Sequence, residues 1–354
     1  YKVNNTFGDS YWSLANLKTY KFDNNEISSL KKMINDEFIP NEEKIFMHFA
    51  LGKVFEDNKD FHESFKHYEL GNKLKIPYTK YKIKKFEEEC ANQIDVFTKD
   101  LFNIKKDWGA QSNEPIFILG LPRVGSTLVE QILSSHSMVD ATHELPNILA
   151  IAHKLNLRRA QDIESRYPDI LLSLSAPQLK LIGENYISDS KIFRSGAKYF
   201  IDKMPNNFRH IGLIKLILPK AKIIDIRRNS MSACFSCYKQ LFAEGQEFTY
   251  SQERLASYYN NYVDLMNHWN EVLPNEILSI TYEDLITNFE DSVNTILEYC
   301  NLPFEQSCIE FYKNKRSVKT PSAQQVRQPI YTSGLDYWKN YESYLGDLKK
   351  YLKY

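Results

Sequence analysis

The sequence predicts an α/β domain built on a P-loop-like parallel sheet with flanking helices, preceded by an all-α block. From residue 115 onward, short apolar runs typical of buried strands alternate with segments of helical spacing. Residues 1–110 instead carry helical patterns separated by Asn and Asp, without a glycine-rich loop or a strong strand pattern. We therefore predict two domains, a helical region over 1–110 and an α/β domain over 111–354.

Composition excludes several classes of function. The 354 residues are 43% hydrophobic and 25% charged, as in ordinary globular proteins, and the formal net charge is zero. An overall charge of zero gives no reason to expect nucleic acid or an anionic membrane as partner, so any anion site must be local. No run approaches the roughly 20 apolar residues of a membrane-spanning helix.

The five cysteines favour a reducing compartment. Their number is odd and they are scattered, which argues against a disulfide framework. We expect a cytoplasmic location, although the first residue is Tyr1 and a targeting segment upstream stays open. Cys234 and Cys237 have C-x-x-C spacing within an apolar, helix-like run, where packed thiols are favoured over a redox or zinc site.

The helical block carries a repeat-like pattern. Small residues, aromatics and a closing proline resemble the tetratricopeptide repeat at Leu51, Gly52, Phe55, Tyr68, Gly71 and Pro77. Fewer than three repeats rarely fold alone, so the block should pack on the next domain or end a longer array. A peptide-binding array and a generic helical cap remain equally open. One long helix over 80–106 and a linker at 111–113 should follow.

The α/β region contains four strand patterns and five helix patterns. The strands are expected at 116–119, 199–201, 222–226 and 277–281, and the helices at 127–136, 206–216, 230–242, 253–273 and 288–299. Ligands of such sheets bind at the carboxyl ends of the strands. Four residues that follow strands should therefore lie along one rim, namely Arg123, Lys203, Arg228 and Tyr282.

The first strand runs into a candidate phosphate loop. An apolar run ends at Gly120, a turn follows, and helical spacing begins near Thr127. Such a turn points backbone N–H groups inward, and the helix N-terminus adds partial positive charge. The spacing resembles a nucleotide-binding P-loop, but Ser126 stands where a triphosphatase has lysine. The loop therefore predicts phosphate binding and disfavours a magnesium triphosphate. Its residues are Pro122, Arg123, Val124, Gly125, Ser126, Thr127 and Leu128.

A second stretch, 221–242, offers a guanidinium and a hydroxyl. Arg228 follows a buried strand, and Ser236 lies about two helical turns further on, which suits a second phosphate. Together the two stretches resemble the sulfotransferases that use 3′-phosphoadenosine 5′-phosphosulfate (PAPS). The most similar branch comprises the tyrosylprotein and the bacterial tetratricopeptide sulfotransferases. Further matches follow in the family's order, at Glu144, Lys203, Tyr282, Ser322, Arg327 and 338–341.

The resemblance implies a role for each match. The loop 122–128 would hold the 5′-phosphosulfate, Arg228 and Ser236 the 3′-phosphate, and Tyr282 would lie near the adenine. Glu144 would be the general base, with Lys203 and Arg123 offsetting charge in catalysis. A further loop, with Ser322 and Arg327 as its best candidates, would close over the nucleotide. PAPS would be the co-substrate and 3′-phosphoadenosine 5′-phosphate (PAP) the product, without a metal.

Several alternatives stay open. His136 is a second candidate base, although a role at a helix end is favoured. The chain could be a P-loop kinase or nucleotide hydrolase, or a non-catalytic interaction protein acting through its helical repeats. The acceptor hydroxyl could belong to a protein tyrosine, a small molecule or a glycan. A basic patch for an acidic peptide could come from Lys154, Arg158 and Arg159, but a solvated helix face is favoured.

Overall fold

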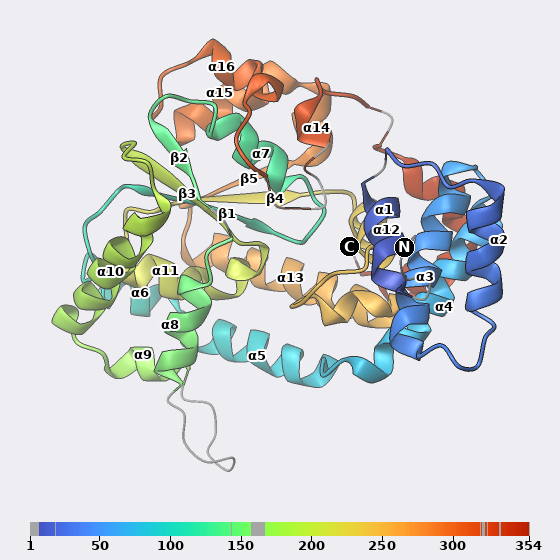
Figure 1. Ribbon diagram of the computed structural model, residues 1–354. Coiled ribbons are helices and arrows are strands. Elements are labelled where there is room, and N and C mark those ends of the chain that lie inside the picture. The colour runs from blue at the N-terminus through green and yellow to red at the C-terminus, as the bar shows by residue number, and fades with distance from the viewer. Residues whose placement is uncertain are drawn as a thin grey trace. The chain divides into compact units, whose positions relative to one another are not determined.

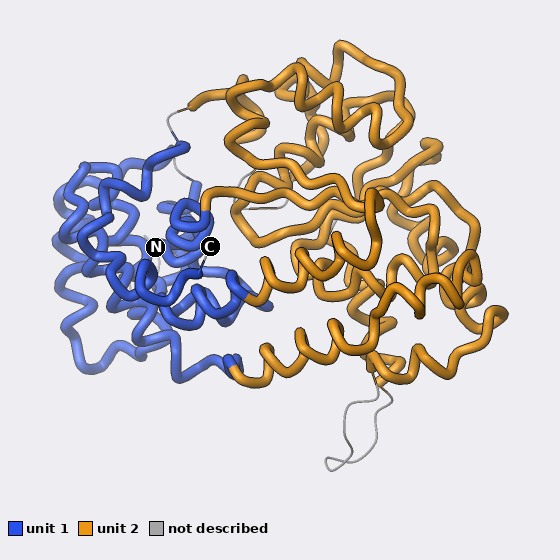
Figure 2. The backbone as a smooth tube through the Cα atoms, turned by 180° about the vertical axis from the view of Figure 1, so that it is seen from behind, with its two compact units in different colours: residues 1–83, 230–260, 333–354 blue, residues 84–229, 261–332 orange. Residues whose placement is uncertain are grey.

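The computed structural model describes residues 7–17, 19–142, 144–156, 167–318, 320, 323, 325–332 and 334–353. The chain forms two compact units (Figure 2). Unit 1 comprises Tyr1–Ile83, Ser230–Asn260 and Ser333–Tyr354, and unit 2 comprises Lys84–Asn229 and Asn261–Thr332. The division into 1–110 and 111–354 describes domains along the chain and stays a prediction.

Unit 2 contains a five-stranded, wholly parallel sheet in the order β2-β3-β1-β4-β5. The predicted parallel sheet is therefore confirmed. All six residues of the central strand β1 are buried, which explains its unbroken apolar run. The strands are β1 (Pro115–Gly120), β2 (Val139–Ala141), β3 (Tyr199–Lys203), β4 (Lys222–Arg227) and β5 (Ile277–Thr281).

Helices flank both faces of this sheet, with α7 and α15 on one side and α10 and α11 on the other (Figure 1). Helix α13 (Gln252–Val272) contains the boundary between the two units. The other α-helices assigned to unit 2 are α5 (Ile83–Val96), α6 (Lys99–Ile104), α7 (Ser126–Leu133), α8 (Asn147–Leu155), α9 (Ile170–Ser173), α10 (Ala176–Ser190), α11 (Ile211–Ile217), α14 (Tyr282–Thr287), α15 (Phe289–Tyr299) and α16 (Gln306–Ile309).

The prediction of one long helix over 80–106 is wrong. The segment forms α5 and α6, separated at Phe97 and Thr98. The Thr98 side chain caps α6 by accepting a hydrogen bond from the Leu101 amide at 3.2 Å. Phe97 is fully buried and packs edge-on against Trp269, with 5.3 Å between ring centroids. The break therefore combines a local cap with burial of one aromatic ring in the unit's core.

Unit 1 is helical, as predicted for the N-terminal region. In the pair α3 and α4, a Cβ on Gly52 would lie 2.6 Å from the Tyr68 ring, so the small residue lies where the two helices cross. The Ser64 hydroxyl donates to the Gly52 carbonyl at 2.7 Å. The tetratricopeptide assignment itself stays a prediction. The remaining α-helices are α1 (Gly8–Asn16), α2 (Asn24–Met33), α3 (Asn41–Asp57), α4 (Phe61–Lys75), α12 (Ser230–Tyr238) and α17 (Gly346–Tyr351).

Short 3-10 helices complete the described secondary structure. They lie at Ile76–Tyr78, Lys191–Phe193, Pro205–His210, Glu247–Tyr250, Phe311–Lys313, Gln325–Arg327 and Tyr337–Tyr344. Within the part of the chain that the structure describes, no helix is both long enough and apolar enough to span a membrane.

Candidate active site

The loop between β1 and α7 depends on two glycines with positive φ. Gly120 has φ 133° and Gly125 has φ 106°, which side chains rarely adopt. A Cβ on Gly120 would lie 2.4 Å from the carbonyl oxygen of Ile226, and one on Gly125 would lie 2.5 Å from the Tyr282 ring. Helix α7 begins at Ser126 directly after the turn. The strand, turn and helix start predicted from the sequence are therefore present.

Tyr282 and two arginines meet at this loop. Tyr282 is the first residue of α14, directly after β5. The guanidinium of Arg228 lies 4.7 Å from the centroid of its ring, within the range of a cation–π contact. Arg228 Nη1 also donates to the carbonyl oxygen of Arg123 at 3.3 Å. Burial raises the pKa of Tyr282, and the positive charge of Arg228 opposes that rise.

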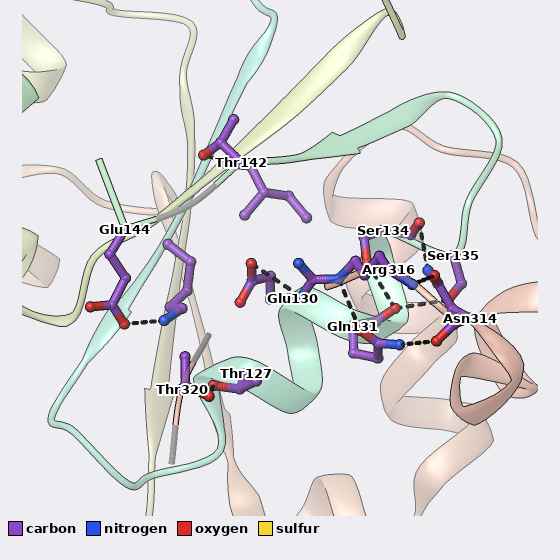
Figure 3. A network of polar contacts seen from close by, with 12 residues as sticks. Thr127, Glu130, Gln131, Ser134, Ser135, Thr142, Glu144, Asn314, Arg316 and Thr320 are labelled. Atoms are coloured by element: carbon purple, nitrogen blue, oxygen red, sulfur yellow. Dashed lines mark hydrogen bonds and ion pairs between the residues drawn. The ribbon is translucent and has the colours of Figure 1, made fainter. Parts of the chain in front are cut away.

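The predicted base and the predicted lysine form an ion pair. Lys203 is the last residue of β3, and its Nζ contacts Oε1 of Glu144, which follows β2 (Figure 3). The Lys203 side chain is 3% exposed, whereas that of Glu144 is 46% exposed. The Thr142 hydroxyl donates to the Ile201 carbonyl at 2.7 Å and so fixes the chain before Glu144 against β3. The pair thus presents an accessible carboxylate over a buried cation.

A second carboxylate in this region was not predicted. Glu130 lies on α7, is buried, and has its Oε1 3.1 Å from Nη2 of Arg316. Burial raises the pKa of Glu130, while the charges of Lys203 and Arg316 act in the opposite direction. The available signal was that Glu130 is the one charged residue of α7, a helix that is buried throughout. Its partner is too distant in the sequence for any local pattern to link the two.

The other predicted site residues have different positions. Ser236 lies on α12 in unit 1, and its pairing with Arg228 stays a prediction. Ser322 lies outside the described residues, as do Arg158 and Arg159. Arg327 Nη2 donates to the Arg316 carbonyl at 3.0 Å. Several loop side chains are buried and would act through their backbone or hydroxyl groups, namely Pro122, Val124, Ser126, Thr127 and Leu128.

His136 occupies a structural position. Its ring is buried, Nε2 lies 2.9 Å from the Pro303 carbonyl, and Nδ1 accepts from the Met138 amide at 3.1 Å. Both ring nitrogens therefore have backbone partners beyond the end of α7, which favours the structural role. Within the described ranges, no group of three or more His, Cys, Asp or Glu could hold a metal ion. Cys234 and Cys237 are buried thiols.

Comparison with known proteins decides the family. A family model described as the sulfotransferase family matches residues 115–306, which is more than half of the chain. The chain belongs to the sulfotransferase family. The matched range contains all five strands of the sheet and both residues of the Glu144–Lys203 ion pair.

Two relatives extend the comparison of this sulfotransferase. An uncharacterised protein of Aquifex aeolicus (strain VF5) is 33% identical over 334 residues, covering 93% of this chain and 44% of that protein. Protein-tyrosine sulfotransferase 1 of Danio rerio is 25% identical over 248 residues, covering 63% of this chain and 65% of that protein. The chain thus spans less than two thirds of the length of either relative.

Among solved structures, the sulfotransferase domain from the Synechococcus PCC 7002 olefin synthase aligns with a TM-score of 0.47 and 19% identity. That alignment covers 66% of this chain and 90% of that domain. The family assignment rests on the match over residues 115–306.

Proposed function

We propose that this chain transfers the sulfuryl group of PAPS to an acceptor hydroxyl. The observation that carries the proposal is the Glu144–Lys203 ion pair, since it joins the ends of β2 and β3 in the sheet whose central strand leads into the phosphate loop. An accessible carboxylate supported by a buried cation suits a base that works next to a departing anion. Membership of the sulfotransferase family supports the same reaction.

PAPS would bind at the carboxyl edge of the sheet. The backbone N–H groups of 124–127 and the hydroxyls of Ser126 and Thr127 would hold the 5′-phosphosulfate. Arg228 would hold the 3′-phosphate, and the Tyr282 ring would contact the adenine. The contacts that join Arg228, Tyr282 and the loop support this assignment. Arg327 and Ser322 are proposed for the segment that closes over the nucleotide.

The transfer would follow an in-line path. Glu144 takes the proton of the acceptor hydroxyl, whose oxygen forms a bond to the sulfur of PAPS. The bond between that sulfur and the 5′-phosphate oxygen breaks, and its electron pair leaves with PAP. Lys203 and Arg123 stabilise the charge that develops on this oxygen. A sulfuryl group carries less negative charge than a phosphoryl group, so we propose that these donors act without a metal.

A P-loop kinase or nucleotide hydrolase is less consistent with the residues. Such an enzyme uses a lysine where this chain has Ser126. For the acceptor, we propose a protein tyrosine first, on the similarity to the Danio rerio protein-tyrosine sulfotransferase. Protein contacts through the helical region would then help to select the substrate. Mass spectrometry of products from a tyrosine peptide, a small phenol and a sugar alcohol would identify the acceptor class.

The substitution Glu144→Gln tests the proposed base. An amide keeps the shape of the side chain but cannot take the acceptor proton, so turnover should fall at least about 100-fold. The dissociation constant for PAP, measured by calorimetry, should stay within about threefold of wild type. Glu184→Gln on α10, another exposed carboxylate paired with a lysine, is the matched control and should keep full turnover. Near-normal turnover of Glu144→Gln would place the base elsewhere.

A further inference from the structure

A C-terminal segment, residues 311–318, lies along helix α7, and we refer to it as the strap. Gln131 Nε2 donates to the carbonyl oxygens of Phe311 and Asn314, each at 3.1 Å. Asn314 Nδ2 donates in turn to the Ser134 carbonyl at 3.1 Å and to the Ser135 hydroxyl at 3.2 Å (Figure 3). These bonds attach the beginning of the strap to the C-terminal end of α7.

Arg316 attaches the strap one turn closer to the phosphate loop. Its Nε donates to Oε1 of Gln131 at 2.9 Å, and its Nη2 lies 3.1 Å from Oε1 of Glu130. The Glu130 side chain is 4% exposed and that of Arg316 is 18% exposed. Gln131 is fully buried and uses both ends of its amide on the strap. Three polar side chains therefore fix a single register between strap and helix.

The contacts advance toward the helix N-terminus as the chain advances. Asn314 contacts residues near the end of α7, Arg316 contacts its middle, and the Thr320 hydroxyl lies 3.3 Å from that of Thr127 in the first turn. The Arg316 carbonyl also accepts the bond from Nη2 of Arg327. Arg316 thus contacts α7 through its side chain and Arg327 through its carbonyl oxygen. Thr320, further along the same segment, reaches the first turn of α7 next to the phosphate loop.

We propose that Glu130, Gln131 and Arg316 form a latch that sets the register of the strap on α7 and so positions Arg327 and Thr320 for nucleotide binding. The inference rests on the proposed function, because it assigns the nucleotide to this edge of the sheet. The three latch residues are positioning residues. Because they act on binding, their loss raises the KM for PAPS and leaves kcat nearly unchanged at saturation.

Two variants distinguish a role of the latch in PAP binding from a role in stability alone. Arg316→Met leaves the buried Glu130 carboxylate without its ion-pair partner, so it lowers both the melting temperature and the affinity for PAP. The double variant Glu130→Met with Arg316→Met removes both buried charges and recovers most of the melting temperature. The double variant still lacks the hydrogen bond that Arg316 donates to Gln131 in wild type. Its affinity for PAP therefore stays at least about tenfold below wild type.

A third variant, on the same strap but outside the latch, serves as the control. Lys313→Met removes an exposed cation from the same strap, where it pairs with Glu310, and should bind PAP like wild type. If the double variant recovers both melting temperature and PAP affinity, the latch is only structural and the proposal is overturned. Wild-type affinity in Arg316→Met would overturn it as well.

Hydrogen exchange without nucleotide distinguishes failure of the latch from failure of the proposed function. Amides of 311–318 should exchange faster in Arg316→Met than in wild type, while those of β1 keep their protection. Unchanged exchange of the strap overturns the latch whatever the nucleotide. If wild type does not bind PAP but the strap loosens in Arg316→Met, the register role stands and its assignment to PAP binding is overturned.

Discussion

Asp202, the residue before Lys203 on β3, is fully buried. Side chains alternate across a strand, so it points to the opposite face from Lys203. Its carboxylate accepts from the Tyr186 hydroxyl at 2.7 Å and from Nδ2 of Asn207 at 3.4 Å. Burial raises the pKa of Asp202 to about 7, and the Tyr186 hydrogen bond and the Lys203 charge only partly offset that effect. The sheet that carries Lys203 therefore contains a buried carboxyl group that is protonated, and so uncharged, below about pH 7.

The substitution Asp202→Asn should remove one component of the pH dependence of stability. An unfolded Asp titrates near 4, so between about 4 and 7 the native state binds the extra proton. Its contribution to stability is complete below the unfolded pKa and disappears as pH rises through about 7. From pH 5 to pH 8, wild type should lose about 3 kcal/mol more unfolding free energy than the variant. Urea titrations at the two pH values measure this, and parallel behaviour would contradict it.

At the residue level, the positions suggested by short motifs can be located in the structure, while their roles stay predictions. The phosphate loop, Glu144 and Lys203 were proposed from short motifs, and the structure places Lys203 against Glu144. Glu130 and Arg316 were missed because contacts such as Arg316 with Gln131 join residues 185 positions apart. A buried ion pair of this kind leaves no periodic pattern, and only the folded chain brings its two charges together.

At the scale of elements, the connection from β1 to α7 depends on Gly125. The substitution Gly125→Ala introduces a methyl group 2.5 Å from the Tyr282 ring at a φ of 106°, so Tyr282 must shift. PAP affinity should fall at least about tenfold, because the loop loses the geometry that points its N–H groups inward.

Gly196 provides the matched control for that substitution. It has the same φ of 106°, but a Cβ at this position would have nothing within 4 Å. Gly196→Ala therefore introduces a side chain at the same positive φ, at a cost of order 1–3 kcal/mol, without the contact to Tyr282. It should lower the melting temperature but leave PAP binding unchanged. Equal losses of affinity in the two variants would show that strain alone, and not the Tyr282 contact, is responsible.

Element prediction followed the strength of the hydrophobic pattern. All four predicted strands are present. β1 and β3 are buried throughout and β4 is buried except at its ends, as their apolar runs predict, whereas β5 is mostly half-buried with Ser279 exposed. The edge strand β2 was missed because its three residues, Val139–Ala141, form no such run. The two helices α5 and α6 were predicted as one because the burial of Phe97 against Trp269 is a tertiary effect. Local propensity cannot reveal such a break.

At the scale of the whole molecule, the compact units are not continuous in sequence. Unit 1 collects three separate stretches of chain. In its core, the Tyr341 hydroxyl lies 2.9 Å from that of Ser64, which shows how the C-terminal stretch completes the packing of α4. The sequence pattern at 51–77 predicted small residues where α3 and α4 cross, but it did not predict that Tyr341 contacts Ser64. Pairings over such separations depend on the fold, so composition and periodicity could not supply them.

We propose that this sulfotransferase binds the adenosine bisphosphate part of PAPS and does not bind a magnesium–nucleoside triphosphate. The most direct measurement is thermal unfolding of wild type with PAP and, separately, with ATP and magnesium. At 100 times its dissociation constant, PAP should stabilise the chain by about 2.7 kcal/mol, and ATP with magnesium should have no comparable effect. Stabilisation by ATP with magnesium but not by PAP would show that the loop serves a nucleoside triphosphate and not PAPS.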